Sequence, residues 1–241
     1  MLNINKLKEK IAVLVRRIVF GSASSPERFL IHLKEMGIEI GEGTEFFSPM
    51  TTIVDTQNPK LIKIGKNVRV TAGCKILTHD FSSSVLAGKY GECIGAIGSV
   101  KIGDNVFIGV NTVILRNTRI GNNVIIGAGS VVSGVVEDDS VYVGVPAKKI
   151  MTIDDFYIKR REKVDSEIKN VASQIDLKNK EEAWKYLREY ACYFEDAPKS
   201  LQEKQMKDMG YFEFCQKYYK KYVFKYNLKS LEKENYESVK D

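Results

Sequence analysis

Long hydrophobic runs are missing from this chain of 241 residues, and its cysteines are few and scattered. No apolar run approaches the roughly 18 residues that a membrane-spanning helix needs. The cysteines match no CxxC spacing, which favours free thiols in a reducing compartment over disulfides or zinc binding. They are Cys74, Cys93, Cys192 and Cys215. We therefore expect a cytoplasmic protein.

A strong charge imbalance is missing as well. The net charge is +6, with 18 Lys or Arg against 13 Asp or Glu in residues 1–150 and 19 against 18 in residues 151–241. This distribution gives no nucleic-acid footprint, so we expect no nucleic-acid partner. A signal peptide is not expected either, because Arg16 and Arg17 interrupt the N-terminal apolar stretch too early.

A six-residue repeat is the dominant feature that the sequence does have. Aliphatic residues recur every six positions, at Ile64, Val70 and Ile76 and again at Ile102, Ile108, Ile114, Ile120, Ile126 and Val132. Two residues before each of these nine positions stands a small, β-branched or apolar residue. Each repeat is therefore predicted to form a short strand.

Asparagine and glycine mark the turns between these strands. They stand three residues after an aliphatic position, of which Ile40 is an upstream member in the same phase: Gly43, Asn67, Gly73, Asn105, Asn111, Asn117, Asn123 and Gly129. Both residue types tolerate a positive φ well, so a left-handed turn is predicted every six residues. Three strands and three turns make one triangular coil of 18 residues, and we predict a left-handed parallel β-helix over residues 38–150.

The repeat is interrupted once and is flanked by helical sequence. Ile76 and Ile102 are 26 residues apart rather than 24, so residues 80–98 are predicted to form a loop thrown out from one corner. Residues 1–37 are predicted to form a helical cap, in which Ser25 and Pro26 begin the second helix. Residues 151–241, rich in Lys, Glu and aromatic residues, are predicted to form a C-terminal helical extension.

The basic helix predicted over residues 5–20 allows two interpretations. Its apolar stripe could cap the first coil of the β-helix, or the helix could lie on an acidic membrane surface as a peripheral contact. The Tyr and Lys residues at 218–222 are ambiguous in the same way. They could belong to a helical packing unit, or they could contact sugar rings or a partner at the membrane surface.

Three stretches of the repeat region resemble the hexapeptide-repeat acyltransferases, particularly the galactoside, maltose and capsular-polysaccharide O-acetyltransferases. They are Ile102–Gly109 (IGDNVFIG), Ile120–Val132 and Val143–Lys148 (VGVPAK). The resemblance covers about residues 38–150 and not the helical extension. It implies a homotrimer, acetyl-CoA bound between neighbouring β-helices, and a loop histidine that acts as general base.

Histidine is scarce, because the chain holds only His32 and His79. His79 stands where the repeat gives way to the loop and matches the family's catalytic position; there it could take the acceptor's proton and then protonate the CoA thiolate. The alternative is a histidine in a surface turn. His32 lies on the predicted cap helix, where a structural role is favoured. A carbonic-anhydrase-like zinc site needs three imidazole ligands, so no metal is expected.

Two aspartates are candidates beside His79. Asp80 follows it directly, and we predict a catalytic role in positioning the imidazole, with a plain turn residue as the alternative. Asp55 lies in a stretch that resembles the galactoside acetyltransferases, and we predict that it binds the acceptor substrate. A contact with His79, or an unremarkable polar corner, are the other interpretations of Asp55.

The resemblance also implies residues that bind acetyl-CoA. Lys148 matches the family's phosphate-contacting lysine, and Lys149 could assist it. Phe107 stands where the family usually carries tryptophan. Three small residues could let the pantetheine arm lie along the backbone, although turn geometry also explains the glycine: they are Gly109, Ala128 and Ser130.

The sequence thus predicts an acetyl-CoA-dependent O-acetyltransferase that acts on a sugar or polysaccharide hydroxyl in surface-polysaccharide biosynthesis. One alternative is N-acetylation of an amino sugar, including a nucleotide-linked one, and another is a β-helix scaffold that has lost catalysis. A sugar-nucleotide pyrophosphorylase is excluded because the 37 residues before the repeat leave no room for a nucleotide-binding domain.

Overall fold

The computed structural model describes residues 4–209 and 226–231. The chain divides into two compact units, Met1–Phe156 and Tyr157–Asp241. The first unit is built around a left-handed parallel β-helix, as predicted, and the second is helical. Each unit is described separately below.

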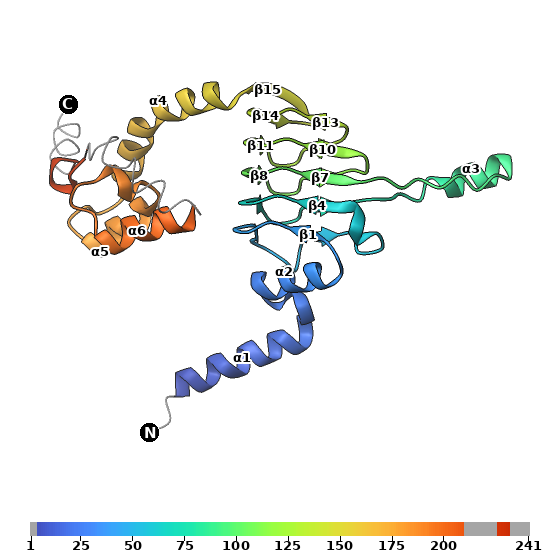
Figure 1. Cartoon of the computed structure of the whole chain (residues 1–241). Coiled ribbons are helices and arrows are strands. Elements are labelled where there is room, and N and C mark those ends of the chain that lie inside the picture. The colour runs from blue at the N-terminus through green and yellow to red at the C-terminus, as the bar shows by residue number, and fades with distance from the viewer. Residues whose placement is uncertain (1–3, 210–225, 232–241) are drawn as a thin grey trace. The chain divides into compact units, whose positions relative to one another are not determined.

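Three sheets form the sides of the β-helix, and successive strands from β1 to β14 pass from one sheet to the next (Figure 1). The first sheet contains β1 (Glu39–Ile40), β4 (Ile62–Ile64), β7 (Val100–Ile102), β10 (Thr118–Ile120) and β13 (Val135–Val136). The second contains β2 (Glu45–Phe46), β5 (Arg69–Val70), β8 (Val106–Ile108), β11 (Val124–Ile126), β14 (Ser140–Val143) and β15 (Lys148–Thr152). The third contains β3 (Ile53–Val54), β6 (Lys75–Ile76), β9 (Val113–Ile114) and β12 (Val131–Val132).

The six-residue repeat fills the core of the β-helix. All nine aliphatic positions are buried, and so are the nine residues two positions before them, from Ile62 to Ser130. Neighbouring strands pair in parallel so that equivalent positions stack, as in the register of Val70 with Ile108 and of Ile108 with Ile126. Apolar side chains therefore stack along the axis, which removes their surface from water in every coil. The predicted core is confirmed.

The corners have the backbone conformation that the Asn and Gly pattern predicts. All eight predicted turn residues have a positive φ, which ranges from 53° at Asn67 to 73° at Gly73. The side chains add a ladder along one corner, in which Asn105 donates to Asn123 and Asn123 donates to Asp139, each over 2.8 Å. Asp139, at φ 51°, continues the same turn one coil further than the repeat indicates.

Two irregularities interrupt the coils. The predicted loop leaves the β-helix through an antiparallel bridge between His79 and Ile97, and it carries a helix, α3 (Ser83–Tyr90), that the sequence did not predict (Figure 1). A second slip follows Val132, because the next inward position is Val136, four residues on rather than six. The short 3₁₀ turn η2 (Pro59–Leu61) precedes β4.

The N-terminal helices differ in what they contact. Helix α2 (Pro26–Glu35) begins at the predicted Ser25 cap and buries Phe29 and Leu33 at the end of the β-helix, with Phe29 edge-on to Phe46 at 5.3 Å. Helix α1 (Ile4–Phe20) and the 3₁₀ turn η1 (Gly21–Ser24) precede it, and the described side chains of α1 are exposed. The cap is therefore α2 rather than the whole N-terminal segment.

The other end of the β-helix is closed differently, because β15 pairs antiparallel with β14 and ends the second sheet. The second unit contains most of α4 (Ile153–Ala172), α5 (Lys180–Leu187), the 3₁₀ helix η3 (Arg188–Tyr193) and α6 (Lys199–Asp208). Its own core includes Ile168, Leu187 and Phe194. The cluster at 218–222 and Cys215, which belong to the predicted extension, lie outside the described residues. Every helix among the described residues is too short or too polar to span a bilayer.

Candidate functional site

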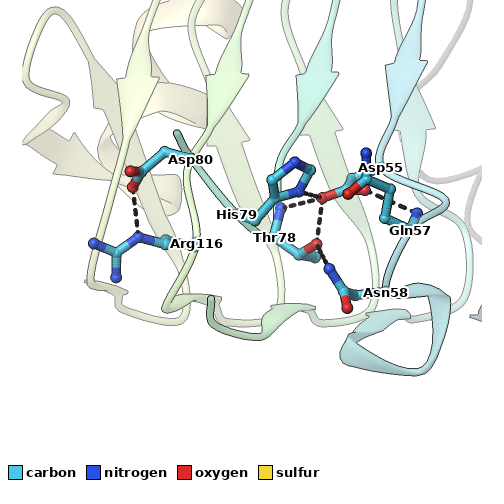
Figure 2. Close-up of polar contacts among 7 residues, drawn as sticks. All are labelled: Asp55, Gln57, Asn58, Thr78, His79, Asp80 and Arg116. Atoms are coloured by element: carbon cyan, nitrogen blue, oxygen red, sulfur yellow. Dashed lines mark hydrogen bonds and ion pairs between the residues drawn. The ribbon is translucent and has the colours of Figure 1, made fainter. Parts of the chain in front are cut away.

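The candidate site lies at the corner that follows the strands of the third sheet. Asp55 follows β3, and Thr78 and His79 come shortly after β6. Arg116 is the second residue after β9. These strands pair in parallel, with Val54 beside Ile76 and Ile76 beside Ile114. Polar residues far apart in the sequence are therefore stacked at one corner, where the loop 80–98 leaves the β-helix (Figure 2).

Asp55 is the buried centre of this group, with 4% of its side chain exposed. Its Oδ1 accepts a hydrogen bond from the Gln57 amide over 3.0 Å. Its Oδ2 accepts from the Thr78 amide over 3.1 Å and from the Thr78 hydroxyl, and it contacts His79 Nδ1 at 2.5 Å. Asn58 completes the group, with its Nδ2 3.5 Å from the Thr78 hydroxyl.

The charge of Asp55 follows from these contacts. Burial by itself raises the pKa of the carboxyl, because it disfavours the charged form. Hydrogen bonds from the Thr78 hydroxyl, the Gln57 amide and His79 act in the opposite direction and outweigh burial, so the pKa of Asp55 lies below its ordinary value. Asp55 is therefore an ionised carboxylate at neutral pH.

His79 is held on this carboxylate by one ring nitrogen. A carboxylate only accepts hydrogen bonds, so the contact assigns the proton to Nδ1 and leaves Nε2 with its lone pair. About a third of the side chain is exposed, at 35%. No hydrogen bond joins Nε2 to any residue in the described part of the chain. The ring is fixed at one nitrogen and is accessible for proton transfer.

Asp80 is placed elsewhere, although it is the neighbour of His79 in the sequence. Its Oδ2 accepts from Arg116 Nε over 2.8 Å, and its Oδ1 accepts from the Ser82 hydroxyl over 2.5 Å and from the Ser82 amide. The Ser82 hydroxyl and then Arg116 hold the pKa of Asp80 far below its usual range. Figure 2 shows Asp80 directed to Arg116 and away from the imidazole. The carboxylate that contacts His79 is Asp55, not Asp80, and Asp55 lies too deep to offer a free oxygen to a substrate.

Sequence reasoning missed four residues of the site, namely Gln57, Asn58, Thr78 and Arg116. The repeat itself carries a signal that could have found Thr78 and Arg116. Both stand two residues after the aliphatic position of a strand, Ile76 and Ile114, at equivalent places in successive coils of one sheet. Gln57 takes part through its backbone amide, for which the sequence offers no signal.

The residues predicted to bind acetyl-CoA lie in several environments. Phe107 projects outward from β8 and is 43% exposed. Lys148 is exposed and forms no ion pair with an acidic residue in the described ranges, whereas Lys149 pairs with Glu137 at 2.7 Å. That pairing raises the pKa of Lys149, first through the hydrogen bond from its ammonium to Glu137.

Two of the three small residues predicted beside them, Gly109 and Ser130, serve the β-helix itself, whereas Ala128 is exposed. A Cβ on Gly109 would come within 2.5 Å of the Ala128 amide nitrogen, so the close approach of two coils already requires glycine there. Ser130 is fully buried, and its hydroxyl donates to the Gly127 carbonyl over 2.7 Å and accepts from the Gly144 amide. The Ser130 side chain therefore supports a turn and presents no hydroxyl at the surface.

The loop beside His79 carries apolar side chains that nothing in the described ranges covers. Helix α3 buries none of its residues. The most exposed apolar residues are Phe81 at 80%, Val85 at 70% and Tyr90 at 65%, followed by Ile97 and Ile94. The chain's other histidine, His32, lies on α2 at the end of the β-helix.

Comparison with known proteins gives one family match and several related proteins. The family described as bacterial transferase hexapeptide (six repeats) matches residues 99–134. Protein CapG of Staphylococcus aureus is 39% identical over 133 residues, which cover 55% of this chain and 76% of that protein. A protein of Schizosaccharomyces pombe named "putative acetyltransferase" is 29% identical over 150 residues, which cover 62% of this chain and 70% of that protein.

Among solved structures, the chain matches a hexapeptide-repeat acetyltransferase from Vibrio cholerae. It is 28% identical with a TM-score of 0.42, and the match covers 48% of this chain and 62% of that one. The family match lies within the β-helix, from the residue before β7 to the residues after β12.

Proposed function

The chain belongs to the bacterial hexapeptide-repeat transferases and is an acetyltransferase, and from this premise we propose that it transfers an acetyl group from acetyl-CoA to a hydroxyl group of a sugar. The observation that carries this proposal is the contact between His79 and Asp55 at an accessible corner of the β-helix. A hydroxyl is a weak nucleophile and needs a base at the moment of attack. His79 supplies that base.

Both proton transfers use the same nitrogen of the imidazole ring. Nε2 of His79 accepts the proton of the acceptor hydroxyl while the oxygen attacks the thioester carbon. The ionised Asp55 stabilises the resulting imidazolium through Nδ1 and keeps the ring in the required tautomer, as carboxylates do in histidine-based hydrolases. Nε2 then returns the proton to the leaving sulfur, so that the products are the acetyl ester and CoA thiol. In this scheme His79 is the catalytic residue and Asp55 positions it.

The donor is proposed to contact exposed residues of the β-helix. Lys148 is an exposed cation without an acidic partner in the described ranges, which suits a donor that carries several phosphates. Phe107 offers an exposed ring on the second sheet. Lys149 is less suited, because Glu137 already neutralises it. No metal is needed in this scheme, since the proton transfers are assigned to His79.

A homotrimer is proposed as the working form, on the resemblance of the motifs and on one feature of the structure. The loop 80–98 follows His79, and its side chains Phe81, Val85 and Tyr90 are largely exposed among the residues that the structure describes. Contiguous exposed apolar surface is typical of an interaction site. A second copy that covers the loop would bury this surface and enclose the site at its base.

The acceptor is proposed to be a sugar of a surface polysaccharide, on the resemblance of the motifs alone. The cytoplasm is the proposed location, because the scattered cysteines favour free thiols in a reducing compartment. N-acetylation of an amino sugar is the competing reaction. An amine is already nucleophilic once deprotonated, so it depends less on a base of the kind that His79 and Asp55 provide.

The decisive experiment compares His79→Gln with the matched variant His32→Gln, which changes the chain's other histidine. Acetyl-CoA turnover is measured over a panel of glycan acceptors, and the product is treated with mild alkali, which cleaves esters and leaves amides. We expect His79→Gln to lower kcat by about 10²–10⁴-fold, the usual contribution of a general base, and His32→Gln to leave it unchanged. Turnover that survives in His79→Gln overturns the role of His79, and an alkali-stable product overturns O-acetylation.

A further inference from the structure

Helix α1 presents an apolar face that no described part of the chain covers. Ile11, Leu14, Val15 and Ile18 follow the spacing i, i+3, i+4, i+7, which places them on one side of a helix. They are 52%, 55%, 52% and 74% exposed, respectively. The end of the β-helix is already covered by Phe29 and Leu33 of α2. Capping therefore does not account for the apolar face of α1.

Such a face could pack against α1 helices of other copies or against an anionic surface, and the charge of α1 favours the second. Its 17 residues include five Lys or Arg and a single Glu. A bundle of α1 helices from several copies would bring these like charges together, whereas helices that pair across an interface normally carry complementary charges beside the apolar seam. An anionic surface would instead attract each basic residue that reaches it.

The positions of the basic residues also favour an anionic surface as the partner of α1. Lys10 and Arg17 are both exposed and stand seven residues apart, so they lie on the same side of the helix. They flank the apolar face, since each directly precedes one of its members, Ile11 or Ile18. This arrangement lets apolar side chains enter a lipid layer while the cations stay at the level of the headgroups.

We propose that α1 binds an anionic lipid bilayer and lies in the plane of its surface. The helix is not long and apolar enough to cross the membrane, and it has the composition of interfacial helices, with basic residues beside a broad apolar face. The chain would thereby be held at a membrane as a peripheral protein. This inference concerns α1 alone and does not depend on the proposed chemistry at His79.

The test is co-sedimentation of the full-length protein with vesicles. The probes are vesicles of phosphatidylcholine alone and vesicles of phosphatidylcholine mixed with phosphatidylglycerol, at low ionic strength and at about 0.5 M NaCl, where surface charges are largely screened. We expect binding to the mixed vesicles at low salt, and at least severalfold weaker binding to pure phosphatidylcholine or at high salt.

Two double variants and a matched control separate the contribution of the apolar side chains to vesicle binding from that of the charges. Leu14→Gln with Ile18→Gln removes half of the apolar face, and we expect at least about tenfold weaker partitioning, because each side chain contributes substantially when it leaves water. Lys10→Gln with Arg17→Gln is expected to weaken binding to the mixed vesicles only. Val13→Gln is the control, since Val13 is 67% exposed but lies about 200° around the helix from Ile11. It should change partitioning less than about twofold.

Two results would overturn the proposal. The first is binding that is absent in the unmodified chain or unchanged in Leu14→Gln with Ile18→Gln. The second is a lower oligomer mass for that variant in light scattering without vesicles, which would show that α1 packs on a second copy instead. Acetyl transfer to a soluble acceptor is measured in the same samples. It should be equal in all of them, so that a failure here remains distinct from a failure of the proposed reaction.

Discussion

Replacing Asp55 with asparagine removes the charge behind His79 while keeping the shape of the side chain. Oδ2 of Asp55 faces three donors, from His79 and Thr78, whereas Oδ1 faces only the Gln57 amide. The new amide group therefore directs its oxygen to His79 and Thr78 and its NH₂ group to Gln57, where two donors meet. The imidazole keeps its tautomer in Asp55→Asn, but it loses the carboxylate that stabilises the imidazolium.

The size of the effect follows from the geometry. Nδ1 and Oδ2 are 2.5 Å apart, at a site where the aspartate is buried and the ring is 35% exposed. Two unit charges about 4 Å apart interact by about 4 kcal/mol at the effective dielectric constant of about 20 that suits protein sites. Solvent at the ring reduces this to about 3 kcal/mol, which corresponds to about a 10²-fold lower kcat. The unsatisfied donor pair at Gln57 should also lower the free energy of unfolding by about 1–3 kcal/mol.

The assay is steady-state acetyl transfer, and Asp80→Asn is the matched control. Asp80 neighbours His79 in the sequence but is bonded to Arg116 and Ser82, so we expect less than about a tenfold change in kcat for Asp80→Asn. Equal losses of kcat in the two variants, or an unchanged kcat in Asp55→Asn, would refute this account of the site.

Further predictions concern the core, the coil contacts, the donor and pH. Ile108→Ala should lower the free energy of unfolding of the β-helix in denaturant by about 2–5 kcal/mol, because Ile108 is fully buried, whereas Val135→Ala at an exposed position should change it by less than about 0.5 kcal/mol. Gly65→Ala should cost about 1–3 kcal/mol in the same measurement, since its Cβ would overlap the backbone of the next coil. Lys148→Ala should raise KM for acetyl-CoA by roughly tenfold with little change in kcat, as removal of one phosphate contact does. The stabilisation from Asp55, whose pKa is lowered in the folded chain, should be fully present above about pH 4 and be lost as the pH falls further, so acid titrations of the chain and of Asp55→Asn should converge there.

The β-helix could be predicted from the sequence because every coil repeats the same physical requirement. An inward position must be apolar, and a corner must tolerate a positive φ, so both requirements appear in the sequence at a fixed period. The burial of Ile64 to Val132 and the left-handed corners from Gly43 to Gly129 confirm both. The four-residue step from Val132 to Val136 could not be predicted, because this spacing occurs once and forms no recurring pattern in the sequence.

Segments outside the repeat were less predictable because no period constrains them. The stripe of α1 and the buried residues of α2 are both apolar residues at helical spacing. Hydrophobic periodicity does not distinguish an apolar face that packs against the same chain from one that is exposed. Only the structure shows that Phe29 and Leu33 are covered while Ile11 and Ile18 are exposed. Helix α3 was missed within the loop because it has no buried face and hence no apolar pattern.

The site shows most clearly where sequence reasoning ends in a β-helix. His79 could be singled out because histidine is scarce and the loop begins there, but its partner could not be chosen by adjacency. Asp80 is one residue away and is directed to Arg116, whereas Asp55 is 24 residues away and contacts Nδ1 of the imidazole. Residues in contact across a corner belong to successive coils, so they are separated by about one coil in the chain, with the number set by local insertions such as η2. A carboxylate partner in this fold should therefore be sought at the equivalent corner of the preceding coil, and the comparison of Asp55→Asn with Asp80→Asn tests that rule directly.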